Sequence, residues 1–552
     1  MNNQLLTQQY RRLDNDIAML AMRMKSTGPY ERSMFVPHSD SKAVLLAEWE
    51  KLMQRTEALE ASDRVHRLLK DRFREFLTCT RVMVDDMYKR PMIGLYSFMF
   101  AVDNLVHRDS RSCAERRDIL MDRFAQLSDV WEGMRSWLKD APSMDLKEIM
   151  SVFGGYVYGA RADIEGMEPV MAELGASGVA EIAAAIEDTA RRMEGWIKEL
   201  QQILTERGVT AEETGEKDII RFEESYYRKL LGDTLGVELD ELLEWHEDEV
   251  EKTREECLAL AAKICGSEKA PSNMREVDAY LHKHSGACSS SDEMFARQRE
   301  YISRARAAAH QFISLPEDET CGAEPIAKRK ERDYPWGAYE SGCSVRRPLH
   351  GVMVLNKGNY KNISDGWLKM TAIHECYPGH HAQFVRQTLD TIPQTQKIYV
   401  MGTPLKEGTA HRSEREFAFI FEEDPLYPLF VAYRRHHTAT RIKADLWLRY
   451  FGRPIGDAVQ LYVDELGVDP VSARGQVRSQ ESMQAFYTSY YYGVKKLEQM
   501  EKQSGLSSIE FTRRLFDVGD LSLGCFKQYL ELNQEERNRY LTDYSSIYQF
   551  GE

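Results

Sequence analysis

The segment from residue 371 to 381, Thr-Ala-Ile-His-Glu-Cys-Tyr-Pro-Gly-His-His, constrains the fold of this chain more than any other stretch. Its first half is typical of a helix, but Pro378 lacks a backbone donor and clashes with the carbonyl four residues earlier, which belongs to His374. Gly379 tolerates backbone angles that other residues avoid. We therefore expect a helix that bulges or breaks at this point.

His374 and Glu375 match the start of an HExxH motif, in which two His one turn apart bind zinc and the Glu acts as general base on the metal-bound water. Pro378 occupies the place of the second His. His380 and His381 lie about 9 and 10.5 Å further along a straight helix, too far to share an ion with His374. If about two residues loop out, His380 becomes the second ligand, whereas three would select His381; we favour His380.

Glu407 is the predicted third ligand, because catalytic zinc usually keeps three protein ligands and one open position. It follows His380 by 27 residues, which leaves room for the first helix to end near residues 391–395 and for a second to begin near Pro404. The alternative is an acidic side chain favoured by a helix N-terminus. The sequence thus predicts one zinc ion per chain, with Glu375 taking and returning a proton.

These residues resemble the DUF885 family, which is placed among the gluzincin-type metallopeptidases. The likeness rests on His-Glu-x-x-Pro-Gly-His-His, on the Glu-Gly that begins at Glu407, and on Glu414 seven residues later. It extends to the strand before the metal helix at residues 350–356. It also includes an Arg-x-x-x-Asp pair, Arg441 and Asp445, and a Ser-Tyr-x-x-Gly segment at 489–493. The resemblance to the family is clear from about residue 311 to the C-terminus and vague before residue 311.

The resemblance implies a metallohydrolase, but the surroundings of the motif depart from the family pattern. The family usually has Trp-Ala-Leu-Tyr after Glu-Gly, where this chain has Thr409, Ala410, His411 and Arg412, and a common His is replaced by Leu448. If His411 and Arg412 face the pocket, the pocket is more polar than usual; if they face water, the two changes carry no meaning for the substrate. Ordinary peptidase specificity is the property that these changes put in question.

Other candidates would assist the metal or contact the substrate. Glu414 and whichever of His380 and His381 does not bind metal are expected to support the ligands. Tyr490 is the candidate oxyanion donor, with aromatic packing as its alternative. Arg441 and Arg478 suit a substrate carboxylate, although an Arg441–Asp445 helix salt bridge is the simpler interpretation.

Composition describes an ordinary globular protein of 552 residues with 43% hydrophobic and 29% charged residues. The net charge of −15 argues against nucleic acid or an anionic membrane as partner. Nine Cys without a CxxC pair indicate reduced thiols, and no secretory signal or long apolar run is apparent. We therefore expect a cytoplasmic protein; the oligomeric state is not predicted.

Hydrophobic periodicity predicts a mainly α-helical, metallopeptidase-like fold, with a small sheet that includes residues 351–355 beside a deep cleft. Residues 1–310 would form one wall, and residues 311–552 would carry the metal. Helices are predicted at 44–60, 66–88, 178–207 and 237–264, and a loop-like insertion at 266–292.

The function predicted from these features is zinc-dependent hydrolysis of an amide in a short peptide or amino-acid conjugate, as by a dipeptidase or carboxypeptidase. One alternative is a specialised biosynthetic or catabolic metallohydrolase that acts on a non-peptide amide or ester. Another is a helical binding scaffold without catalysis, in which the Pro-Gly break holds the His residues apart.

Overall fold

The structure is a computed structural model, and helices account for most of it, which confirms the mainly α prediction. It describes residues 3–35, 39–91, 95, 98, 102, 104–209, 221–266, 269–331, 335–342, 348–389, 391–398 and 400–545. The predicted helices are present as α2 (Ser39–Ala58), α3 (Arg64–Lys89), α7 (Gly175–Glu206) and α9 (Leu239–Cys265).

The remaining described α-helices fall on both sides of the sheet in the sequence. Those before the sheet are α1 (Asn3–Met24), α5 (Cys113–Leu138), α6 (Ser143–Val170), α8 (Glu224–Leu230), α10 (Met274–His284) and α11 (Ser291–Ala309). Those after it are α12 (Asp365–Thr371), α13 (His380–Thr388), α14 (Thr403–Glu416), α15 (Tyr427–Asp445), α16 (Ile455–Leu466), α17 (Pro470–Ser482), α18 (Thr488–Ser504), α19 (Ser508–Asp517), α20 (Leu523–Glu531) and α21 (Gln534–Thr542).

Helix ends follow local sequence signals. Asp63 caps α3 by accepting a hydrogen bond from the backbone N–H of His66, and Ser507 forms a reciprocal capping box with Glu510 at the start of α19. The predicted stop after α7 is confirmed, since Gly208 adopts a φ of +70° beyond its end. The insertion at 266–292 contains the short helix α10 in its described part.

The predicted small sheet is present among the described residues as β1 (Thr320–Pro325), β2 (Gly337–Ser341) and β3 (His350–Leu355). The central strand β3 pairs in parallel with β1 and antiparallel with β2. Its residues from Gly351 to Leu355 are buried. At Gly351 a Cβ atom would lie 2.4 Å from Nδ1 of His381, so the sheet packs directly against the motif segment.

The described helices share more than one hydrophobic core. The largest core joins side chains of α1–α3 to those of the sheet and of the C-terminal helices. Helices α5–α7 enclose a second core that includes the stacked Trp131 and Trp196. The boundary predicted at residue 310 stays a prediction; the largest core contains residues from both sides of it.

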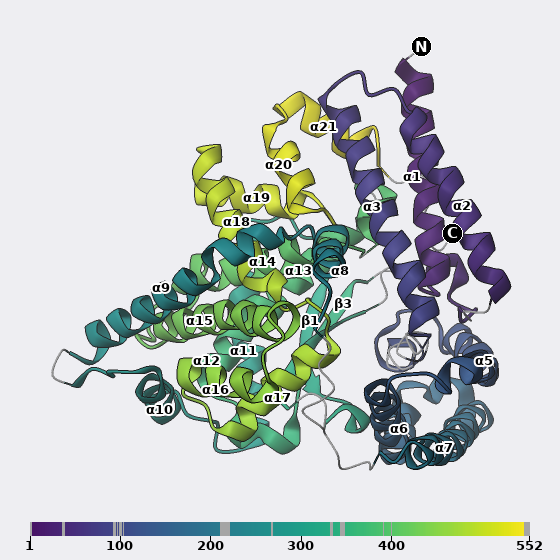
Figure 1. The fold of residues 1–552 in the computed structure, drawn as a ribbon, viewed down its shortest axis with the longest axis horizontal. Helices are drawn as coiled ribbons and strands as arrows, with labels where there is room; N and C mark the ends of the chain where they lie inside the picture. The colour runs from purple at the N-terminus through teal and green to yellow at the C-terminus, as the bar shows by residue number, and fades with distance from the viewer. Residues whose placement is uncertain are drawn as a thin grey trace.

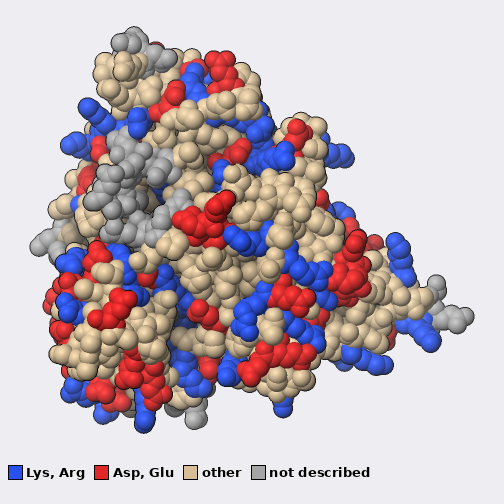
Figure 2. Space-filling view, turned by 180° about the vertical axis from the view of Figure 1, so that it is seen from behind, with Lys and Arg blue, Asp and Glu red and all other residues tan. Residues whose placement is uncertain are grey.

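Figure 1 shows α5, α6 and α7 grouped at one corner, while α3 lies beside the C-terminal helices α20 and α21. Arg64 of α3 forms an ion pair with Glu536 of α21 at 2.6 Å, which ties the two ends of the chain together. Figure 2 shows acidic and basic side chains interspersed over one face of the molecule. The cysteines within the described ranges are free thiols.

Within the described ranges, no helix taken singly has the length and apolar character that a membrane crossing requires. The residues 145–170 and 172–206 meet that criterion only as a pair bent by 74°.

Candidate metal centre

The predicted helix break lies where Pro378 and Gly379 interrupt the motif. Helix α12 runs into a π-helical turn, Ala372–Cys376, Tyr377 is extended, and α13 begins at His380. A Cβ atom on Gly379 would lie 1.8 Å from the carbonyl oxygen of His374, so only glycine fits this close approach. The break brings the rings of His374 and His380 to a centroid separation of 4.9 Å.

Glu407 joins the two imidazoles from α14. Its Oε2 atom lies 3.6 Å from Nε2 of His374 and 3.6 Å from Nε2 of His380. Two ligands of a tetrahedral zinc, each about 2.0–2.1 Å from the ion, lie about 3.3 Å apart. The observed distances are close to that value and too long for good hydrogen bonds. Glu375 belongs to the same group, with possible ligand atoms of His374, Glu375 and His380 all within 4.8 Å.

In the neutral form that donates from Nδ1, each of the two imidazoles presents an Nε2 lone pair towards Glu407. Nδ1 of His374 lies 2.7 Å from Oε1 of Glu414. Because an ionised carboxylate can only accept, Nδ1 is the donor of this hydrogen bond. Nδ1 of His380 lies 2.9 Å from Oε1 of Gln383, whose amide orientation is fixed by donation from Nε2 to the Lys406 carbonyl. Oε2 of Glu407 is itself buried without a hydrogen-bond partner. Two lone pairs and an unpartnered carboxylate oxygen converge, and this donor set fits a divalent cation.

The electrostatics of the group also favour positive charge. Burial lowers the pKa of His374, but Glu407 and Glu414 outweigh that effect and raise it to about 10. Burial would raise the pKa of Glu407, yet His380 and His374 hold it well below its usual range. Part of the group is open to solvent, with 20% of the His380 side chain and 12% of Glu407 exposed.

Glu414 contacts two imidazoles. Its Oε1 atom accepts from Nδ1 of His374 and also from Nδ1 of His411 at 2.9 Å. Burial lowers the pKa of His411 to about 4, so its imidazole is neutral and keeps a lone pair on Nε2. That buried Nε2 has no hydrogen-bond partner among the described residues. His411 therefore adds an unsatisfied acceptor beside His374, whose ring is 4.7 Å away.

His381 points away from this group. Its Nε2 lies 2.8 Å from Oε2 of Glu319, and its Nδ1 lies 2.9 Å from the hydroxyl of Tyr339 on β2. Glu319 also accepts from Tyr377 and from Arg306. The structure thus brings His380, rather than His381, beside His374 and Glu407, and it uses His381 to anchor the motif to the sheet.

Tyr490 reaches the site because α14 and α18 cross with their backbones in contact. A Cβ atom on Gly408 would lie 2.5 Å from the carbonyl carbon of Gly493, and one on Gly493 would lie 2.0 Å from the carbonyl oxygen of Pro404. The ring of Tyr490 lies 5.6 Å from that of His411. Burial and the charge of Glu407 raise its pKa well above the usual value, so the phenol keeps its proton and can donate it in a hydrogen bond.

The arginine candidates have different surroundings. Arg441 does not pair with Asp445, which instead accepts from the Tyr227 hydroxyl; its guanidinium lies 4.5 Å from the ring of Tyr487 and 5.5 Å from that of Tyr490. The simpler salt-bridge interpretation is therefore wrong. Arg478 lies at an exposed position of α17.

Two further arginines lie near the motif. Arg412, one of the departures from the family pattern, turns away from the site and forms a bidentate ion pair with Glu501. Arg434, which the sequence did not single out, interacts electrostatically with Glu407 and Glu414. Its position seven residues before Arg441 on one helix, two turns apart, was the available signal.

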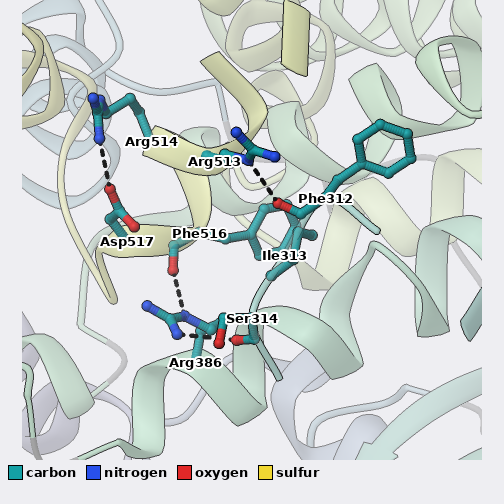
Figure 3. Close-up of a pocket in the computed structure, with 8 residues that line it drawn as sticks. All are labelled: Phe312, Ile313, Ser314, Arg386, Arg513, Arg514, Phe516 and Asp517. Carbon is teal, nitrogen blue, oxygen red and sulfur yellow. Dashed lines mark hydrogen bonds and ion pairs between the residues drawn. The ribbon is translucent and has the colours of Figure 1, made fainter. Parts of the chain in front are cut away.

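A separate cavity of about 220 Å³ is lined by Arg386 of α13 and by none of the candidate ligands. In its wall, Arg386 donates from Nε to the Phe516 carbonyl at 2.8 Å and from Nη1 to the Ser314 carbonyl at 3.0 Å (Figure 3). The Arg386 guanidinium is therefore bound to two backbone carbonyl groups. The cavity shares no lining residue with the candidate metal centre.

The fold and site define a large, mainly helical protein in which a group of His and Glu side chains comes from a broken helix and from α14. The family model for a bacterial protein of unknown function, DUF885, matches residues 38–525, so this chain belongs to the DUF885 family. The match extends the likeness into the N-terminal half, where motifs gave little guidance. No curated protein matches the chain.

Two solved structures share the fold. One is a protein of Colwellia psychrerythraea described as a candidate lipoprotein, with a TM-score of 0.74 at 15% identity, covering 98% of this chain and 99% of that chain. The other, from Shewanella oneidensis and described as a candidate lipoprotein of unknown function, has a TM-score of 0.63 at 12% identity, covering 96% of this chain and 100% of that chain. The expectation of a cytoplasmic protein is wrong on this comparison, because lipoproteins are anchored at a membrane.

Proposed function

We propose that this protein is a zinc-dependent hydrolase that cleaves an amide bond in a short peptide or an amino-acid conjugate. One observation carries the proposal: the buried, unpartnered Oε2 of Glu407 faces Nε2 of both His374 and His380, with Glu375 beside them. His374, His380 and Glu407 are the residues that would hold the ion. When bound, zinc supplies a Lewis acid that polarises a carbonyl and lowers the pKa of water towards about 7.

The side chains around that group have complementary tasks. Glu375 has no hydrogen-bond or ion-pair partner within the described ranges, so its carboxylate is free to take a proton and pass it to the leaving amine. Glu414 fixes the tautomer of His374, and Gln383 does the same for His380. Tyr490 keeps its phenolic proton and is the donor for charge that develops on the carbonyl oxygen.

A second candidate keeps the metal and changes the substrate to a non-peptide amide or ester. Its support is the departure from the family pattern at His411, whose buried Nε2 has no partner among the described residues and calls for a donor on the substrate. Profiling products by mass spectrometry, with dipeptides and tripeptides beside acylated small molecules, separates the two candidates.

Metal content and turnover test the proposal together. We expect one zinc per chain in the wild type and its loss in His374→Ala, measured by elemental analysis after dialysis. Glu375→Gln should keep the zinc and lose at least about a hundredfold in turnover. The matched control is Glu422→Gln, because Glu422 is exposed on the surface. Equal metal content in wild type and His374→Ala would instead favour a binding scaffold, and unchanged turnover in Glu375→Gln would sink the mechanism.

A further inference from the structure

Two arginines on α15 face the same region without a carboxylate partner. Arg434 and Arg441 form no ion pair with any acidic side chain in the part of the chain that the structure describes. Arg441 is 8% exposed, and Arg434 is only partly exposed. Buried charges in proteins are normally paired, because removing a guanidinium from water without a counter-charge costs free energy.

Neutral groups hold the two guanidiniums in one network. Nη1 of Arg434 lies 3.3 Å from Nδ1 of His437, whose Nε2 lies 3.0 Å from Oε1 of Gln476. Nη2 of Arg441 donates to the same Gln476 oxygen at 3.1 Å. Burial, together with the nearby charges of Arg441 and Arg434, holds the pKa of His437 well below its usual range, so the imidazole is neutral. His437 then accepts from one arginine and donates to Gln476, and no group in the network supplies negative charge.

The network is next to the candidate metal centre. Tyr490 contacts both, with its ring 5.6 Å from that of His411 and 5.5 Å from the Arg441 guanidinium. Arg434 interacts electrostatically with Glu407 and Glu414, as well as with Arg441. The chain of contacts from His374 through His411 and Tyr490 to Arg441 consists of three steps of less than 6 Å each. An extended peptide covers about 3.3–3.6 Å per residue, so such a path is bridged by about five residues at most.

We infer that Arg434 and Arg441 bind the carboxylate of the substrate. This inference rests on the proposed function for the position of the scissile amide, and it names the substrate class: short peptides or N-acylated amino acids with a free C-terminal carboxylate, cut close to that end. Arginine is suited to the task because its planar donors match a carboxylate in a bidentate arrangement. The stacking of Arg441 on Tyr487 fixes the orientation of its guanidinium before the ligand arrives.

The test compares acids with their amides. Twenty acetyl-alanyl-X peptides, one for each amino acid X, are prepared as free acids and as C-terminal amides. Their binding is measured by calorimetry to zinc-treated Glu375→Gln protein, in which hydrolysis is suppressed. We expect at least one free acid to bind about tenfold or more tightly than its amide, since charge-assisted hydrogen bonds would be lost. The Asp and Glu amides reveal whether a side-chain carboxylate can serve instead.

Substitutions locate the effect. When Arg441→Gln or Arg434→Gln is added to the Glu375→Gln protein, the preference for acids over amides should be abolished. The control is Arg453→Gln, which should retain the preference, because Arg453 is exposed and stacks on Trp447. The inference is overturned if no acid binds more tightly than its amide, or if the preference survives both substitutions. The comparison of acids with amides needs neither arginine variant, so an unfolded variant does not remove the test.

Hydrolysis by the wild type separates this inference from the proposed function. If acids bind preferentially but neither acids nor amides are cleaved, the carboxylate site stands and the hydrolase proposal fails. If acids and amides are cleaved at equal rates, the hydrolase proposal stands and the carboxylate site fails.

Discussion

The candidate metal centre and the arginine network, both in contact with the residues around Tyr490, balance their charges in opposite ways. Around His374 two carboxylates, those of Glu407 and Glu414, are served by imidazoles, and one carboxylate oxygen remains unpartnered. Around Arg441 two guanidiniums are served only by neutral acceptors. The first group leaves a carboxylate oxygen without a donor, and the second leaves two guanidiniums without an acidic partner among the described residues. Each is therefore complete only with a ligand, and the two ligands have opposite charge.

The largest effect is expected from the glycine that bends the chain at the metal centre. In Gly379→Ala the added Cβ atom would meet the His374 carbonyl oxygen at 1.8 Å and that of Ile373 at 2.3 Å. The backbone must move, so we expect the free energy of unfolding to fall by more than about 4 kcal/mol and zinc binding to be lost. Urea denaturation and zinc titration measure the two effects.

Gly475→Ala is the matched control for that substitution. Gly475 lies exposed on α17 with no atom within 4 Å of an added Cβ, and alanine there should stabilise the protein by about 0.5–1 kcal/mol. A Gly379→Ala protein with wild-type stability and zinc content would contradict the account of the break.

Paired and unpaired arginines should respond differently to the same substitution. Arg412→Met leaves Glu501 without its bidentate partner, and we expect a loss of about 3–5 kcal/mol in the free energy of unfolding. Arg434→Met removes a charge that has no acidic partner, so we expect a change within about 1 kcal/mol or a gain in stability. Both are measured by urea denaturation in the absence of ligand. Equal losses in the two variants would show that Arg434 is compensated within the protein.

The buried carboxylate behind the motif offers a third comparison, with a pH dependence. Burial would raise the pKa of Glu319, but hydrogen bonds from His381, Tyr377 and Arg306 outweigh it and lower the pKa to about 2. Because the folded pKa is depressed, the stability that this carboxylate contributes is present above its unfolded pKa of about 4.5 and is lost as the pH falls towards 2. About 3 kcal/mol of the free energy of unfolding depends on its ionisation.

Measuring the stability of wild type and Glu319→Gln from pH 7 to pH 2.5 tests this dependence. The difference in the free energy of unfolding between wild type and Glu319→Gln should be constant down to about pH 4.5 and should become smaller below that pH. Glu255→Gln, at an exposed position of α9, is the control and should show no such narrowing. A difference in the free energy of unfolding that stays constant to pH 2.5 would show that ionisation of Glu319 does not stabilise the fold.

The smallest effect is expected from the residue that fixes the ligand tautomer. Glu414→Gln replaces a carboxylate that accepts from both His374 and His411 with an amide that can present a donor instead. We expect zinc affinity to fall about tenfold to a hundredfold, with the fold retained. Competition with a chelating dye measures the affinity. No change would mean that His374 keeps its orientation without Glu414.

Local sequence signals predicted much of the fold and part of the site. The hydrophobic period located α2, α3, α7 and α9 to within a few residues, because each buries one face along its whole length. Pro378 and Gly379 predicted the interruption of the motif helix, since both act on the backbone within one turn. Contacts between distant residues were less predictable. The spacing of Arg441 and Asp445 suggested a helix salt bridge, but the Asp445 carboxylate accepts a hydrogen bond from Tyr227 of another helix.

The sequence by itself determined that this chain is mainly helical, that its motif helix is broken, and which residue types gather near the break, because these follow from chemistry within a few neighbouring residues. Only the tertiary structure decided that His380 faces Glu407 while His381 faces Glu319, and that Arg434 and Arg441 are left without acidic partners. Whether a buried charge is paired depends on side chains brought together from distant helices, and that long-range geometry is not encoded in any local pattern.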